Sequence, residues 1–173
     1  SFTEIRDAFY GLYASRKDRI ESVIKNKWSS ECYEDNAEME KRQKELEKKG
    51  FDAYTREVDA LSEKGCPLTK ALLNSSLKRL VFTILHENFH VHCEKKKIKL
   101  KPEVEEAVGI CFGFQGALLY FKENPQMRGV LKSDLKRYID YYDFINKYLQ
   151  KSTEAYKQGI EEGRKVLRQT KRA

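Results

Sequence analysis

The sequence ILHENFHVHCE at residues 84–94 contains all three histidines of the 173-residue chain. His86, Glu87 and His90 within it form the pattern HExxH. On an α-helix, residues four positions apart differ by ~40° around the axis, so the two imidazoles point the same way and can bind one metal ion. Glu87 lies ~100° from His86, where it flanks a metal without binding it. This spacing predicts two metal ligands beside a carboxylate that can accept a proton from a metal-bound water.

The helix that carries this motif is expected over residues 69–93. Its apolar residues occupy almost the whole circumference: Leu77, Leu80, Val81, Phe82, Ile84, Leu85, Phe89 and Val91. A helix that is apolar on all sides is usually buried, and burial makes imidazole and carboxylate groups costly unless they are paired or bound. His92 lies ~240° from His86, on the far side of the helix, so we do not expect it to be a ligand.

A second helix is expected to supply a third ligand, because a tetrahedral catalytic zinc needs three protein ligands and one open position. Proline is well placed in the first turn of a helix, and Pro102 is followed by three candidate carboxylates: Glu103, Glu105 and Glu106. Glu106 shares a helix face with Gly109 and Gly113. Small residues on that face let this helix lie close to the HExxH helix, within reach of its metal.

Glu105 points to a neighbouring face, with Phe112 and Gly116, and is the second candidate for the third ligand. We predict that His86, His90 and Glu106 bind Zn²⁺ and that Glu87 is the general base. Cys93 and Cys111 are expected to be small buried residues. The four cysteines contain no CxxC pair, which argues against a cysteine-based zinc site.

Two segments together resemble the paired zinc helices of gluzincin metallopeptidases: LVFTILHENFHVH at residues 80–92 and EEAVGICFGFQGA at residues 105–117. They are most similar to a bacterial family of predicted aminopeptidases, in which a helix ending HELxH precedes a helix of the form NESFAxFVxxxGA. The Glu after Asn is the third zinc ligand of that family, and the register aligns it with Glu106. Glu105 then stands where the family has Asn.

The resemblance covers residues 51–123 and has two departures. Asn88-Phe89 replace a Leu-Ala pair, and Leu61-Ser62-Glu63 replace a Tyr-Ser-Thr sequence. The resemblance implies a mainly α-helical, zincin-like metallopeptidase domain with few or no short strands, in which the HExxH helix packs on the glycine-rich helix that carries the Glu. It also implies hydrolysis of peptide bonds by a zinc-activated water, with a peptide or protein as substrate.

The composition favours a single helical domain over residues 1–173. Three prolines and nine glycines are few, and Lys, Glu and Leu are abundant. We expect a charged helical arm over residues 1–50, a zinc-site core over 51–123 and C-terminal helices over 124–173. Within these parts we expect helices at residues 2–27, 31–49, 133–150 and 153–168, and a strand or irregular stretch at 51–59.

The net charge of +7 comes from 34 basic and 27 acidic residues, which are interleaved as on solvated helix faces. Nucleic acid is therefore not the expected partner. No apolar run reaches the length of a transmembrane helix. Without a signal peptide, the chain is expected to be cytoplasmic; because it also lacks an initiator Met, an exported mature form is the alternative. The functional alternative is a non-catalytic helical interaction module that binds protein or nucleic acid and has a structural or degenerate metal site.

Overall fold

A computed structural model describes residues 5–6, 9–26, 29–58 and 68–170. Most of them are helical, as predicted for the class of fold, and a small three-stranded sheet is also present. The chain divides into two compact units, described separately below: unit 1 is Ser1–Tyr10 with Glu57–Leu135, and unit 2 is Gly11–Arg56 with Lys136–Ala173. The single domain predicted for residues 1–173 stays a prediction.

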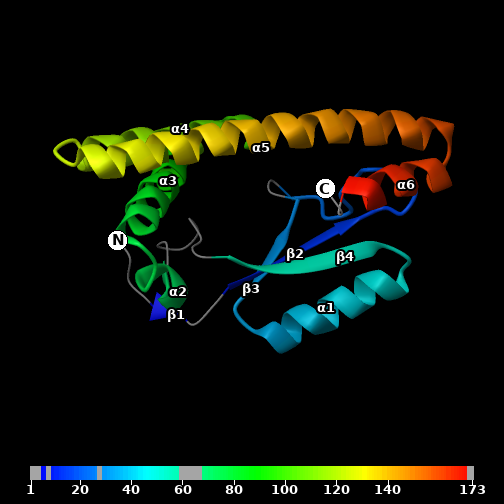
Figure 1. The fold of residues 1–173 in the computed structure, drawn as a ribbon. Coiled ribbons are helices and arrows are strands. Elements are labelled where there is room, and N and C mark those ends of the chain that lie inside the picture. Colours follow the sequence, from blue (N-terminus) through cyan, green and yellow to red (C-terminus); the bar gives the residue numbers. More distant parts are fainter. Residues whose placement is uncertain (1–4, 7–8, 27–28, 59–67, 171–173) are drawn as a thin grey trace. The chain divides into compact units, whose positions relative to one another are not determined.

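Unit 1 contains the HExxH motif. Its helices are α2 (Lys70–Leu73), α3 (Leu77–Lys96), α4 (Pro102–Tyr120) and the first part of α5 (Pro125–Gln158) (Figure 1). Two short parallel strands, β1 (Ile5–Arg6) and β5 (Leu68–Thr69), pair with Ile5 opposite Leu68.

Helix α3, which carries the motif, begins and ends at clear capping signals. The Ser76 hydroxyl accepts a hydrogen bond from the backbone N–H of Arg79, so the predicted helix over residues 69–93 is divided into α2 and α3. At the other end Lys97 adopts a left-handed conformation with φ of 54°, and the N–H of Ile98 bonds back to the carbonyl of Cys93. These caps fix α3 over Leu77–Lys96, with the motif in its middle.

The packing of α3 against α4 depends on glycines of α4, as the sequence predicted. A Cβ atom on Gly113 would lie 2.9 Å from Cε2 of Phe82 and 3.1 Å from the Phe82 carbonyl oxygen. A Cβ atom on Gly116 would lie 2.6 Å from Cδ1 of Leu85. Ala117 is fully buried one turn beyond Gly113. The two helix backbones therefore lie closer than larger side chains would allow.

Unit 2 contains the three-stranded sheet, which has the order β3-β2-β4. Its elements are the strands β2 (Phe9–Ser15, which begins in unit 1), β3 (Glu31–Tyr33) and β4 (Asp52–Val58, which ends in unit 1), and the helices α1 (Asn36–Lys48), the second part of α5, and α6 (Ile160–Thr170). Strand β4 agrees with the strand considered for residues 51–59. Most of the helix predicted over 31–49 is present as α1, but its start is wrong, because Glu31–Tyr33 form strand β3.

The predicted helix over residues 2–27 is wrong, because residues 9–15 form strand β2. Phe9 and Leu12 are buried three positions apart, which suits a helix, but Leu12 and Ala14 are also buried at the two-residue period of a strand. The aromatic content of FYGLYAS favours the strand. Among the described residues, the charged helical arm predicted over 1–50 is thus present only as α1; residues 1–4, 7–8 and 27–28 lie outside the described part.

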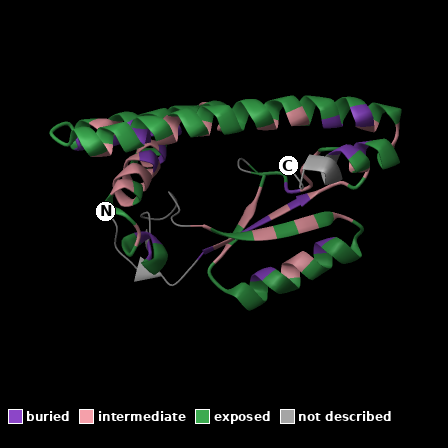
Figure 2. Cartoon of the chain, viewed as in Figure 1, coloured by how far each residue is buried: buried purple, intermediate pink, exposed green. Residues whose placement is uncertain are grey.

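Helix α5 is longer than expected. Two helices were predicted, at residues 133–150 and 153–168, and two are present, but α5 runs from Pro125 to Gln158 and takes in the start of the second, whose remainder forms α6. It starts after Asn124, whose side chain accepts a hydrogen bond from the N–H of Met127 at 2.9 Å. Gly159, with φ of 149°, separates it from α6. Most of α5 is exposed (Figure 2), and no described helix combines the length and apolar character that crossing a membrane requires.

We predict that Gly113→Ala destabilises unit 1 by about 1–3 kcal/mol, since the added methyl overlaps Phe82 at the α3–α4 contact. The matched control is Gly129→Ala in α5, where an added Cβ meets no atom within 4 Å and helix propensity favours alanine by up to ~1 kcal/mol. Urea unfolding of the three proteins measures the difference. Equal stability of both variants would contradict the close approach.

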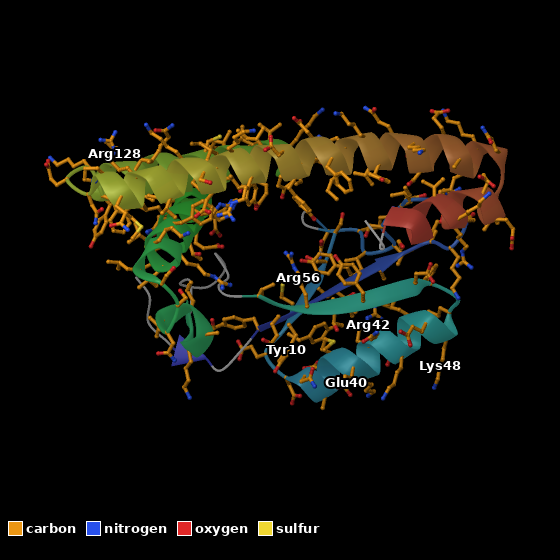
Figure 3. The ribbon with its side chains drawn as sticks, in the orientation of Figure 1. Tyr10, Glu40, Arg42, Lys48, Arg56 and Arg128 are labelled. Carbon is orange, nitrogen blue, oxygen red and sulfur yellow. The ribbon has the colours of Figure 1, made fainter. Side chains whose placement is uncertain are left out.

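In unit 2 an ion pair joins β3 to α1. Nε and Nη2 of Arg42 each donate a hydrogen bond of 3.0 Å to the Glu31 carboxylate (Figure 3 labels Arg42). The side chain of Arg42 is 33% exposed and that of Glu31 is 26% exposed. The hydrogen bond from Arg42 holds the pKa of Glu31 below its ordinary value of 4.5. Because folding lowers the pKa of Glu31, its ion pair with Arg42 stabilises the protein fully above pH 4.5, and this stabilisation is lost as the pH falls below that value.

We predict that Glu31→Gln lowers the free energy of unfolding by about 1 kcal/mol at neutral pH and by less as the pH falls below the range in which Glu31 is ionised. Thermal unfolding across that acidic range measures the effect. Glu57→Gln, at an exposed position of β4, is the control and should change little. The prediction fails if Glu31→Gln shifts stability equally at every pH.

Candidate metal centre

Three side chains from two helices meet in unit 1. His86 and His90 lie on α3, and Glu106 lies on α4. The two Nε2 atoms are 3.1 Å apart. Nε2 of His86 lies 3.4 Å from Oε1 of Glu106, and Nε2 of His90 lies 3.4 Å from its Oε2. Taking one donor atom from each residue, all lie within 4.8 Å of one another. The structure thus brings together the three residues predicted as ligands.

The backbone of α4 opposite the imidazoles leaves room for this arrangement. A Cβ on Gly109 would lie 3.2 Å from Cε1 of His86 and 3.4 Å from Nε2 of His90. Contacts this short would force the rings to shift. Both histidines are buried, whereas the Glu106 side chain is 44% exposed. The centre is therefore enclosed by the helices on the imidazole side and open toward solvent at the carboxylate.

The two imidazoles differ in their electrostatic surroundings. Burial lowers the pKa of His86, and this effect outweighs the attraction of Glu106. Burial also acts to lower the pKa of His90, but the hydrogen bonds that Glu106 and Glu105 accept from it outweigh this effect and raise that pKa overall. The Glu106 carboxylate therefore lies beside both rings, whereas the Glu105 carboxylate lies beside His90 alone.

Glu87, predicted as the general base, is half-buried next to the ligands on α3. Burial raises the pKa of its carboxyl to about 7, with a further contribution from the negative charge of Glu106 and an opposing one from His90. A carboxylate with a pKa close to neutral can both accept and return a proton near pH 7.

Glu105 does not join the group of potential ligands. It is 1% exposed, and its Oε1 lies 3.1 Å from Nδ1 of His90, the ring nitrogen that does not face Glu106. The sequence had identified Glu105 as a second candidate for the third ligand. The sequence did not predict that Glu105 contacts His90. The only signal for this contact was that Glu105 precedes Glu106 and lies on the neighbouring face of the same helix.

The remaining predictions near the motif have mixed outcomes. His92 is exposed and outside the potential metal-binding group, as expected. Cys93 is buried with 2% exposure, but Cys111 is exposed, so the expectation of burial is wrong there. Phe89, inside the motif, packs against Phe112 of α4 with ring centroids 5.7 Å apart.

Neither family models, nor curated protein sequences, nor solved structures match the chain. The resemblance to gluzincin metallopeptidases therefore rests on the two sequence segments and stays a prediction. The helix pairing and the spacing of the donor atoms are the structural observations that bear on function.

Proposed function

We propose that this protein is a zinc-dependent peptide-bond hydrolase with a zincin-like fold, in which His86, His90 and Glu106 hold the metal and Glu87 is the general base. The observation that carries the proposal is the convergence of two Nε2 atoms and one carboxylate within 4.8 Å of one another. Two buried imidazoles whose Nε2 atoms are 3.1 Å apart need a proton or a cation between them, because two unprotonated nitrogens at that distance would direct their lone pairs at each other.

The donor set fits zinc. Zinc in catalytic sites is bound by three protein ligands, among them pairs of histidines with one glutamate. Ligands at about 2.0–2.1 Å from a tetrahedral zinc are separated from each other by roughly 3.3–3.4 Å. The two Nε2 atoms are 3.1 Å apart and each lies 3.4 Å from one of the two oxygens of Glu106, and with one donor atom per residue the three lie within 4.8 Å of one another. The exposed side of Glu106 leaves room for the fourth, open position.

The metal and the residues around it have different roles in the proposed hydrolysis. When bound, zinc would lower the pKa of a water molecule and polarise the scissile carbonyl. Glu87 accepts the proton of the attacking water and returns it to the leaving amine, for which a pKa of about 7 is suitable. His86 and His90 are two of the three buried residues of α3 and lie against Gly109 of α4, so the ligands keep their geometry.

We predict that the purified protein binds about one equivalent of zinc and that His90→Ala and Glu106→Gln each remove most of it, because a site with three protein ligands loses its geometry when one is lost. Metal analysis after dialysis measures the content. His92→Ala is the matched control, since His92 lies on the same helix and outside the group. A zinc-free wild-type protein, or unchanged zinc in both variants, would refute the metal site and favour the interaction module.

We predict that Glu87→Gln keeps its zinc but loses roughly 10²–10⁴-fold in the rate of peptide hydrolysis, because the amide cannot accept the proton. A fluorogenic peptide library is the probe, with metal content measured on the same samples. Glu94→Gln, an exposed position on the same helix, is the control and should hydrolyse peptides at the wild-type rate. Equal rates for Glu87→Gln and wild type would remove Glu87 from this role.

A further inference from the structure

The two carboxylates at the start of α4 have very different surroundings. The Glu106 side chain is 44% exposed, whereas that of Glu105 is 2% exposed. Burying a carboxylate is costly unless it is hydrogen-bonded or paired. Glu105 contacts His90, with Oε1 3.1 Å from Nδ1. Glu105 is buried beside Nδ1 of His90, whereas the more exposed Glu106 lies beside Nε2 of the same ring. We infer that the two carboxylates have different roles.

The Nδ1 atoms of the two imidazoles also have different surroundings. Nδ1 of His86 is buried, lies against the backbone of Gly109 and has no side-chain hydrogen-bond partner within the described residues. Nδ1 of His90 has Glu105. A neutral imidazole carries a proton on only one of its two nitrogens, and the partner of one nitrogen decides which. A carboxylate can only accept, so it selects the form of His90 with the proton on Nδ1.

We propose that Glu105 is a positioning residue: it accepts a hydrogen bond from Nδ1–H of His90 and so keeps Nε2 of that ring unprotonated and directed at His86 and Glu106. This inference rests on the proposed zinc site, in which Nε2 of His90 is a ligand. Hydrogen bonds from a metal-binding imidazole to a carboxylate orient the ring and increase its basicity, and their loss typically costs about 10–100-fold in metal affinity.

The geometry distinguishes this role from ligation. Glu105 approaches Nδ1, on the side of the ring away from the space shared by the two Nε2 atoms and Glu106. A carboxylate there cannot bind the same ion without a rotation of the ring. Glu105 also stands where the resembled family has Asn, so this carboxylate is a feature of the present chain and is not carried over from the family.

The experiment compares zinc affinity in Glu105→Gln, Glu105→Ala and the control Glu103→Gln, by competition with a chromophoric chelator. Glu103 is exposed on the same helix, so its substitution removes a similar charge without touching His90. We expect affinity to fall about 10-fold in Glu105→Gln and up to about 100-fold in Glu105→Ala, with Glu103→Gln unchanged. The glutamine is close in volume but can donate its amide to Nδ1 and stabilise the wrong form of the ring.

A second measurement requires no zinc. Long-range ¹H–¹⁵N NMR of the zinc-free protein, at a pH where the imidazoles are neutral, reports which nitrogen of His90 carries the proton. We expect Nδ1–H in wild type and in Glu103→Gln, and a mixture of both forms in Glu105→Gln. The spectrum also shows whether each variant is folded.

The outcomes separate the two proposals. A wild-type protein that binds no zinc refutes the proposed function, while the NMR result still decides the role of Glu105. Zinc affinity that is equal in wild type and both Glu105 variants, or a His90 ring protonated on Nε2 in the zinc-free wild type, overturns the positioning role.

Discussion

The close contact of α3 with α4 is the constraint on which the site depends. Gly113 and Gly116 let the helices approach at Phe82 and Leu85, and Gly109 continues the same face up to the imidazoles. Only at that separation can Glu106 reach both Nε2 atoms at 3.4 Å. Each of these glycines costs helix propensity of roughly 1 kcal/mol relative to alanine, so their number in one helix is explained by close packing rather than by local preference.

Burial then assigns different properties to chemically similar groups. Glu105, Glu106 and Glu87 are the same amino acid within one cluster, yet Glu105 is fully buried, whereas Glu106, with a side chain 44% exposed, and Glu87 are only partly buried. Glu105 contacts a ring nitrogen, Glu106 lies between two imidazoles, and Glu87 has its pKa raised to about 7. The environment supplied by the two helices, and not residue type, separates these three carboxylates.

The centre could be predicted because its geometry is local. HExxH places two rings on one face by helical period alone, and the glycine-rich face of α4 identified Glu106 over Glu105. The role of Glu105 could not be read in the same way, because its contact with His90 depends on how α3 and α4 are rotated against each other. Strand β2 was missed since FYGLYAS fits two periods equally, and sheet pairing with distant β4 decides between them. The start of helix α5 was predicted too late because Ser133 resembles a cap, and the predicted break after residue 150 is absent because no glycine or proline follows Ser133 until Gly159.

The short connection between α3 and α4 has a consequence for the order of folding. Lys97 turns the chain back immediately after α3, and Pro102 starts the next helix. All three converging donors therefore belong to one helical hairpin, and closing such a short loop costs little entropy. Contacts between neighbouring segments form faster than pairings between remote ones, such as that of β1 with β5. The convergence of the three donors thus belongs to the part of the chain that can assemble first and that depends least on strand pairing.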